Sequence, residues 1–313
     1  MLKIIFAGTP DFAAHHLITL IKSNYQIISV LTKPDSKMYQ RNKNILSPVK
    51  VIAQKYNITV HQPHILDHKI EILLNNLKAD IMIVVAYGIK ITSNIINMFP
   101  LGCINIHASI LPRWRGPSPI QYAILTGDKK TGITIIKMDS SIDTGDIIHI
   151  ETCPISNTDN TKTLTKKLIH ISTKTILFVL KNIKNKNVNY LKQNNLNATY
   201  SKKIHKQDGK INWNKTAIQI NRMIRAYCLW PSSYFNINEN RIKILSSEIK
   251  KQPTNQKHNI GEIISITTKG INVQTKKDIL KIKKIQFPGK NVITSNDIIN
   301  SKITYFKPGL ILQ

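Results

Sequence analysis

The amino-acid sequence predicts an α/β protein in two parts: a doubly wound, mostly parallel sheet, followed by a small OB-like β-barrel. In the first half, continuously apolar runs alternate with helical segments, which is typical of parallel strands covered on both faces. After residue 197, short strands of alternating character follow one another at close spacing. The length of 313 residues is ample for two domains.

The first half is expected to open with a strand at 2–7, closed by Gly8-Thr9-Pro10, and with Asp11 as the cap of a helix from residue 12 to 23. Ser47 and Pro48 have the residue types of a helix cap and a first helical residue, so a second helix is expected from 48 to 56. The remaining elements of this half are strands at 26–31, 58–60, 81–86 and 102–107, and helices at 69–77 and 93–98.

Two strands at 133–138 and 147–150 enclose a polar loop and predict a hairpin-like unit, followed by a basic amphipathic helix at 163–180. The Lys- and Asn-rich stretch beyond it has little core material and predicts a linker. We therefore expect a catalytic domain at 1–189, a linker at 190–209 and a barrel at 210–313. The barrel region should contain a helix at 215–226 and strands at 233–237, 242–246, 261–266, 270–275 and 279–285.

The chain is strongly basic, with 45 Lys and Arg against 17 Asp and Glu and a net charge of +28. Residues 1–150 carry +7 and residues 151–313 carry +21. This charge points to a polyanion, with nucleic acid ahead of an anionic membrane surface. An A+T-rich genome could also inflate the number of lysines, although a uniform coding bias does not explain why the charge lies mostly in the second half.

The cysteines and the N-terminus point to a reducing compartment. Cys103, Cys153 and Cys228 are far apart and form no C-x-x-C pair. The first residues lack the pattern of a signal or transit peptide. We expect a cytoplasmic protein without a membrane segment.

Chemistry is concentrated between residues 86 and 146. Asn105 and His107 share one face of a strand end, where an open parallel sheet binds its ligands. An amide can donate to an oxyanion and an imidazole can act as acid or base, but both side chains could also be satisfied core groups. The Pro-rich loop that follows carries Arg113, Trp114 and Arg115, which suit an anion and a stacked base, or simply a packed surface loop.

Known cofactor motifs are missing from this region. The first turn has Gly8 alone in place of G-x-G-x-x-G, and no P-loop pattern occurs, so a Rossmann dinucleotide site and a P-loop are rejected. The acids of 138–146 lack the spacing of a calcium loop, and the histidines at 61, 64 and 68 are typical of a solvated loop. No metal is expected, and one carboxylate of this loop is better explained as a partner of His107.

Five segments carry a resemblance to the methionyl-tRNA formyltransferases, a branch of the folate-dependent formyltransferases. They are 6–12 (Phe-Ala-Gly-Thr-Pro-Asp-Phe), 85–88 (Val-Ala-Tyr-Gly), 102–107 (Gly-Cys-Ile-Asn-Ile-His), 109–116 (Ser-Ile-Leu-Pro-Arg-Trp-Arg-Gly) and 143–146 (Asp-Thr-Gly-Asp). The resemblance continues more weakly through 224–226 and 230–231 to the end of the chain.

The resemblance implies a formyltransferase-like first domain and an OB-like barrel that holds tRNA. It implies formyl transfer from 10-formyltetrahydrofolate to methionine on initiator tRNA. We expect the protein to be a monomer. The resemblance also implies Asn105, His107 and Asp143 as the catalytic residues. Folate-binding positions would be Ser109, Ile110, Leu111 and Pro112, with Tyr87, Gly88 and Ile89 around the pterin. Candidate tRNA contacts are Arg41, Lys43, Arg113 and Arg115.

Some positions depart from the family pattern. The basic loop at 37–43 lacks the usual glycines around Arg41, Ala108 replaces a glycine, and Pro117 and Ser118 replace small residues. The 227–231 run is a looser version of the family's aromatic-Asn-Pro-Trp-Pro segment. Two other functions stay open: a formyltransferase for a small amine, and a non-catalytic RNA-binding protein with a decayed site.

Overall fold

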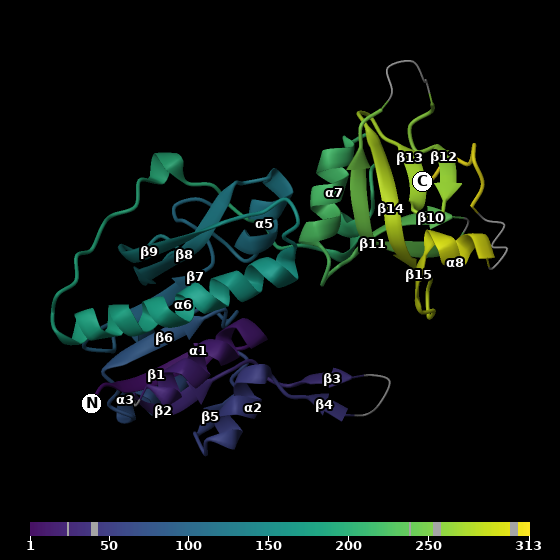
Figure 1. Cartoon of the computed structure of the whole chain (residues 1–313). Coiled ribbons are helices and arrows are strands. Elements are labelled where there is room, and N and C mark those ends of the chain that lie inside the picture. The colour runs from purple at the N-terminus through teal and green to yellow at the C-terminus, as the bar shows by residue number, and fades with distance from the viewer. Residues whose placement is uncertain (24, 39–42, 238, 253–257, 301–305) are drawn as a thin grey trace. The chain divides into compact units, whose positions relative to one another are not determined.

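The structure of the chain is a computed structural model, and it describes residues 1–23, 25–38, 43–237, 239–252, 258–300 and 306–313 (Figure 1). The chain separates into two compact units. The first unit comprises 1–119, 130–154 and 165–201, and the second comprises 120–129, 155–164 and 202–313. Each unit consists of several separate stretches of the chain, because residues 120–129 and 155–164 belong to the second unit.

A seven-stranded sheet forms the centre of the first unit, in the order β5-β2-β1-β6-β7-β8-β9. Strands β5 to β7 pair in parallel, whereas β7 with β8 and β8 with β9 pair antiparallel. The predicted doubly wound sheet and its hairpin-like unit are therefore confirmed. The bounds are β1 Lys3–Gly8, β2 Gln26–Leu31, β5 Val60–His61, β6 Ile81–Val85, β7 Cys103–His107, β8 Lys130–Lys137 and β9 Ile147–Pro154.

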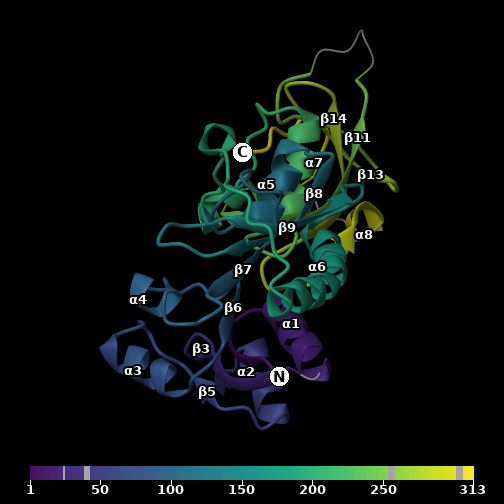
Figure 2. The same cartoon turned by 90° about the vertical axis from the view of Figure 1, so that its left-hand side faces the viewer.

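Helices cover both faces of this sheet (Figure 2). Buried side chains of α3 and α4 pack with those of β1, β6 and the loop after β6 in one apolar cluster. On the other face, α1 and α6 are joined by a hydrogen bond between His16 and Ser172. The helix bounds are α1 Asp11–Lys22, α2 Pro48–Lys55, α3 His68–Asn76, α4 Ser93–Ile96 and α6 Thr161–Lys184.

The starts of α1 and α2 test the predicted helix caps. Ser47 caps α2 and accepts a hydrogen bond from the Lys50 amide at 3.1 Å, as predicted. The prediction that Asp11 is a cap is wrong, because Asp11 is the first residue of α1 and Pro10 precedes it in extended conformation. Asp11 there lies in the first turn, where a carboxylate still interacts favourably with the helix dipole.

The turn between β1 and α1 depends on close packing. A Cβ atom at Gly8 would lie 2.6 Å from Cβ of Ala13 and 3.0 Å from the Val85 carbonyl oxygen. Only glycine therefore allows α1 to start this close to β1 and β6. This glycine therefore serves the close packing of the helix against the two strands.

A buried histidine links stability to pH. His16 is fully buried, its Nδ1 donates to the Phe12 carbonyl at 2.7 Å, and its Nε2 accepts from the Ser172 hydroxyl at 2.7 Å. Burial lowers the pKa of His16 from 6.5 to about 4. In the unfolded chain the ring takes up a proton below pH ~6.5, whereas in the folded chain it stays neutral down to about pH 4.

We expect the free energy of unfolding to fall by about 2 kcal/mol between pH 7 and pH 5 through His16 alone. The His16→Gln variant keeps polar atoms at this position and cannot titrate, so it should lose this share of the pH dependence. Denaturant unfolding of both proteins at the two pH values measures the difference. Equal pH dependence in the two proteins would contradict the assignment.

The second unit contains an antiparallel sheet with the order β10-β11-β14-β13-β12, and β15 pairs with β14. This arrangement confirms that the second part is built around a sheet of short strands, while its OB-like classification stays a prediction. The strands are β10 Ser233–Ile237, β11 Asn240–Lys250, β12 Ile263–Thr267, β13 Gly270–Gln274, β14 Ile279–Gln286 and β15 Val292–Thr294. The helices of this unit are α5 Pro119–Thr126, α7 Ala217–Ala226 and α8 Ser295–Asn300, with a 3-10 turn at Lys206–Gly209.

Two regions contain secondary structure that was not predicted from the sequence. The basic stretch after residue 35 includes a small antiparallel pair, β3 Ser36–Met38 and β4 Lys43–Ile45. The expected linker contains a 3-10 turn at Asn195–Asn197 and bridges from Leu191 to Ile147 and from Tyr200 to Arg115. The domain bounds 1–189, 190–209 and 210–313 remain predictions. Within the described ranges, no helix is both long and apolar enough to span a bilayer.

Candidate active site

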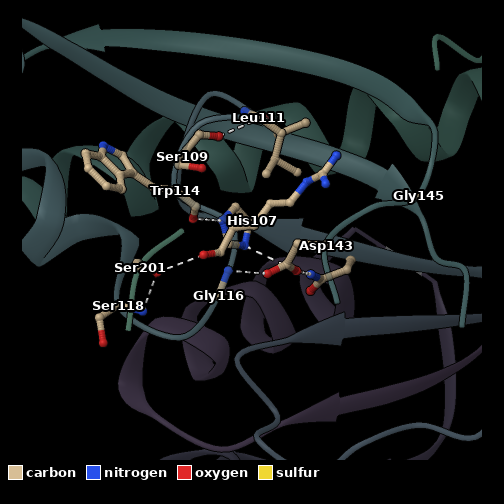
Figure 3. A network of polar contacts seen from close by, with 12 residues as sticks. His107, Ser109, Leu111, Trp114, Gly116, Ser118, Asp143, Gly145 and Ser201 are labelled. Carbon is tan, nitrogen blue, oxygen red and sulfur yellow. Dashed lines mark hydrogen bonds and ion pairs between the residues drawn. The ribbon is translucent and has the colours of Figure 1, made fainter. Parts of the chain in front are cut away.

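The carboxyl end of β7 brings the predicted catalytic residues together. Asn105 and His107 are two residues apart on this strand, and Asp143 lies in the loop after β8. Asn105 Nδ2 donates to Asp143 Oδ1 at 3.2 Å, and His107 Nδ1 lies 3.4 Å from the same oxygen. Figure 3 shows His107 between Asp143 and Trp114. The three side chains expected from the sequence thus form one cluster.

Both nitrogens of His107 face oxygen atoms. Nε2 lies 2.9 Å from the Trp114 carbonyl oxygen, which can only accept, so Nε2 carries a proton in this contact. Nδ1 faces the Asp143 carboxylate. A neutral ring therefore leaves Nδ1 free to accept a proton beside the carboxylate, and a protonated ring donates on both sides. His107 is only 6% exposed, so its tautomer is set by the protein and not by water.

Asp143 is held by three neighbours and a special backbone. Its Oδ2 accepts the Gly116 amide hydrogen at 2.8 Å, while Oδ1 faces Asn105 and His107. Its φ of +56° is in the left-handed region, which is uncommon for a residue with a side chain. The carboxylate is 11% exposed, so these donors replace most of its hydration.

The loop after β7 is braced by β8. The Thr134 hydroxyl donates to the Ser109 carbonyl at 2.7 Å and accepts from the Leu111 amide at 3.0 Å. The Ser109 hydroxyl donates to the Arg113 carbonyl at 2.6 Å. These bonds fix the segment 109–112, the predicted folate-binding run, next to the predicted catalytic residues. Within it Ser109 and Leu111 are buried, and Ile110 and Pro112 are half-buried.

The two arginines of this loop have different environments. Arg113 is exposed, and its guanidinium carbon lies 4.2 Å from the centre of the Trp114 ring, a cation–π contact. Arg115 is only 2% exposed and donates to Gln193 Oε1 and Asn195 Oδ1 at 2.7 to 3.1 Å. The predicted tRNA contact of Arg115 is therefore replaced by an internal role, because its guanidinium is already used to bind residues 193–195.

The other predicted positions lie as follows. Tyr87 is buried after β6, whereas Gly88 is exposed with φ +77° and Ile89 is half-buried. The Tyr87 hydroxyl is buried without a hydrogen-bond partner among the described residues, and burial raises the pKa of this phenol. Arg41 lies outside the described residues, and for Lys43 only the backbone of β4 is described.

Sequence reasoning missed several residues that support the site. The segment 191–201 pairs with Ile147 and with the 112–118 loop, and Thr199 and Ser201 bond backbone groups of that loop at 2.7 to 3.2 Å. The Gln, Thr and Ser residues of this Asn- and Lys-rich stretch could have indicated hydrogen bonds. The neighbouring sequence did not indicate which residues would be their partners. Within the described residues no group of three or more His, Cys, Asp or Glu could hold a metal ion.

This arrangement suits transfer of a carbonyl-containing group to an amine. The second N–H of the Asn105 amide is available to a developing oxyanion. The His107–Asp143 pair can accept a proton from a nucleophile and pass one to a leaving group. The geometry of these three side chains suits direct attack of the amine on the carbonyl carbon.

Comparison with known proteins agrees with this chemistry. Residues 2–180 match the model of the formyl transferase family, and residues 203–302 match its C-terminal domain. The methionyl-tRNA formyltransferase of Buchnera aphidicola (subspecies Acyrthosiphon pisum, strain Tuc7) is 48% identical over 312 residues, 99% of each chain. That of Pseudoalteromonas translucida is 41% identical over 99% of this chain and 97% of its own.

Solved structures share the fold at lower identity. An N-formyltransferase from Helicobacter canadensis, in complex with folinic acid and dTDP-3-aminofucose, has a TM-score of 0.67 and 22% identity, covering 90% of this chain and 99% of its own. HypX from Aquifex aeolicus, in complex with tetrahydrofolic acid, has a TM-score of 0.65 and 13% identity, covering 96% of this chain and 47% of its own. With family matches to both parts of the sequence and relatives of full length, this chain belongs to the formyl transferase family.

Proposed function

We propose that this chain is a methionyl-tRNA formyltransferase that moves the formyl group of 10-formyltetrahydrofolate to the amino group of methionine on initiator tRNA. The observation that carries the proposal is the 48% identity with a methionyl-tRNA formyltransferase over 99% of both chains. The Asn105, His107 and Asp143 cluster supplies the chemistry that such a reaction needs. We further propose that the protein acts as a cytoplasmic monomer, in the compartment where initiator tRNA is used.

Asn105 would stabilise the charge that develops during transfer. When the methionine nitrogen attacks the formyl carbon, a C–N bond forms and the formyl oxygen becomes an oxyanion. One N–H of Asn105 is held by Asp143, and this fixes the direction of the other. A donor that is already oriented stabilises the transition state without reorganisation, which is the largest single contribution expected here.

His107 and Asp143 would manage the protons. The methionine ammonium must lose one proton before attack and a second as the bond forms, while N10 of the folate gains one as its bond to the formyl carbon breaks. His107 Nδ1, beside Asp143, is the group in this cluster that can take up and release a proton, directly or through a water molecule. The net reaction from the ammonium form releases one proton.

The folate donor fits the residues next to this cluster. The donor supplies the activated formyl group; the protein would hold its pterin near 87–89 and the adjoining part against 109–112. The buried Tyr87 hydroxyl, unpaired among the described residues, stays protonated and could donate to a polar edge. The braced segment 109–112 provides a rigid wall beside His107.

The second unit offers a basic hollow for tRNA. A cavity of about 690 Å³ lies between α5, the 202–210 segment and α7, all within this unit. Such a surface attracts phosphates, and the half-buried Tyr122 offers a ring face for stacking. Its lining includes Lys202, Lys203, His205, Lys210, Lys215, Tyr122 and Tyr227. We also propose Arg41, Lys43 and Arg113 as tRNA contacts.

We expect the affinity of this hollow for tRNA to fall steeply as the salt concentration rises. The triple variant Lys202→Ala, Lys203→Ala, Lys210→Ala should reduce the slope of log K against log salt concentration by up to about 3, at about 0.9 per phosphate contact. The control removes three exposed lysines of α6, Lys166, Lys174 and Lys181. Filter binding at several salt concentrations measures both. Equal effects of the two triples would contradict a specific role of the hollow.

A formylation assay with four acceptors tests the function. Initiator Met-tRNA, elongator Met-tRNA, free methionine and an amino-sugar nucleotide are compared at equal concentration with 10-formyltetrahydrofolate. Formyl transfer to initiator Met-tRNA well above the other acceptors supports the proposal. Preference for the amino sugar would support a small-amine transferase, and tRNA binding without any transfer would support an RNA-binding protein with an inactive site.

A further inference from the structure

The loop that carries Asp143 is held by one amide side chain from the segment 191–201. Gln193 Nε2 donates to the Asp143 carbonyl oxygen at 2.9 Å and to the Gly145 carbonyl oxygen at 2.8 Å. Both hydrogens of this amide are thus used on the acid loop, one on either side of residue 144. The two bonds hold the backbone that gives Asp143 its left-handed φ of +56°.

A buried cation fixes the orientation of that amide. Gln193 Oε1 accepts from Arg115 Nε at 3.1 Å and from Arg115 Nη2 at 2.7 Å. Arg115 is 2% exposed and its Nη2 also donates to Asn195 Oδ1 at 2.9 Å. A guanidinium can only donate, so the oxygen of Gln193 must face Arg115 and its nitrogen must face the acid loop.

The same segment also braces the loop that holds His107. The Thr199 hydroxyl accepts a hydrogen bond from the Trp114 amide at 2.9 Å. The Trp114 carbonyl oxygen in turn accepts a hydrogen bond from His107 Nε2. Gly116, whose amide binds Asp143 Oδ2, lies so close to Ser201 that a Cβ atom there would be 2.4 Å from the Ser201 carbonyl oxygen. The segment 191–201 therefore contacts both loops that position the catalytic pair, and Gln193 is its contact with the acid loop.

We infer that Gln193 is a positioning residue of the reaction, oriented by Arg115 and acting through the backbone of the Asp143 loop. This inference rests on the proposed function and names a further residue of the same site. Without the Nε2 bonds, two carbonyls of the acid loop lose their partners, and the carboxylate loses its fixed place beside His107 Nδ1 and Asn105 Nδ2. A displacement of about 1 Å at a catalytic group can reduce the rate by about 10²-fold.

Three variants separate positioning from general damage. Gln193→Ala removes both bonds to the acid loop. Gln193→Glu keeps an acceptor for Arg115 but turns an oxygen toward the two carbonyls. Asn195→Ala, the control, removes a neighbouring acceptor of Arg115 on the same segment without touching the acid loop. We expect the two Gln193 variants to lower kcat by about 10 to 100-fold with KM for Met-tRNA within about threefold, and Asn195→Ala to change kcat by less than about threefold.

A double variant tests whether Gln193 acts through Asp143. If it does, Gln193→Ala added to Asp143→Ala should cause no further loss of kcat, because the carboxylate it positions is already absent. Losses that multiply would overturn the inference. So would equal losses in Gln193→Ala and Asn195→Ala, which would indicate that any loosening of the segment is sufficient.

An activity-free measurement keeps this test independent of the acceptor. The ¹⁵N signals of the His107 ring, assigned with His107→Gln, report on its contact with Asp143. They should shift in Gln193→Ala and stay in place in Asn195→Ala. Failure of the wild-type protein to formylate Met-tRNA would overturn the proposed function alone, whereas unchanged His107 signals in Gln193→Ala would overturn the role of Gln193.

Discussion

Replacement of His107 by alanine is expected to lower kcat/KM for formylation of Met-tRNA by about 10²-fold or more. The His107 ring can both take up and release a proton, and its Nδ1 lies 3.4 Å from the Asp143 carboxylate. Without it, the protons of the attacking amine must pass to bulk water from a site where His107 itself is only 6% exposed. The loss should lie mainly in kcat, since the ring is expected to act in the transition state.

The control for this variant is His64→Ala, which removes an exposed histidine. Steady-state kinetics of the two variants and the wild type at one pH give the comparison. The loss in His107→Ala should not be accompanied by unfolding, because the β7 backbone pairs with β6 and β8 without the ring. Wild-type turnover in His107→Ala would remove this residue from the mechanism.

Replacement of Asn105 by alanine is expected to cost about 10² to 10³-fold in kcat, the effect of removing one oriented donor to an oxyanion. Asp143 retains the Gly116 amide and His107 as partners in this variant, so the proton-handling pair stays in place. The expected defect is thus confined to stabilisation of the developing charge. An effect on KM alone, with kcat preserved, would contradict this role.

Asn75→Ala, at an exposed position of α3, is the matched control and should retain wild-type kinetics. Combining Asn105→Ala with His107→Ala adds a second check. Residues that serve one transition state as a unit show a combined loss smaller than the product of their single losses. Independent multiplication would indicate that the two residues serve separate steps.

The proximity of Asn105 and His107 on β7, the proposed catalytic pair, could be predicted because strand geometry is local. Side chains two residues apart share a face, and the ends of parallel strands gather at one edge of the sheet. Asn105 and His107 followed from these rules. Asp143 could not be chosen among three acids of its loop by such rules, because its place depends on a left-handed backbone and on contacts with Gly116 and Gln193. The family resemblance supplied that choice.

Long-range partners explain what the sequence could not predict. Arg115 looked like a cation for phosphate, since two arginines in a Pro-rich loop are typical of anion binding. Its acceptors, Gln193 and Asn195, are 78 and 80 residues away in the chain. The segment that contains them has few apolar residues, so hydropathy indicated a linker although hydrogen bonds give it an ordered place. The start of α2 was easier to predict, because its cap is set by Ser47 within three residues.

The bridge between Arg115 and Tyr200 also has a consequence for the order of synthesis. The ribosome adds Asn105, His107 and Asp143 long before it adds Thr199, Tyr200 and Ser201, which bind the loop beside them. A nascent chain interrupted near residue 180 would carry the three proposed catalytic side chains but none of these braces. Completion of the catalytic centre must therefore wait for a stretch of sequence that contributes no catalytic group of its own.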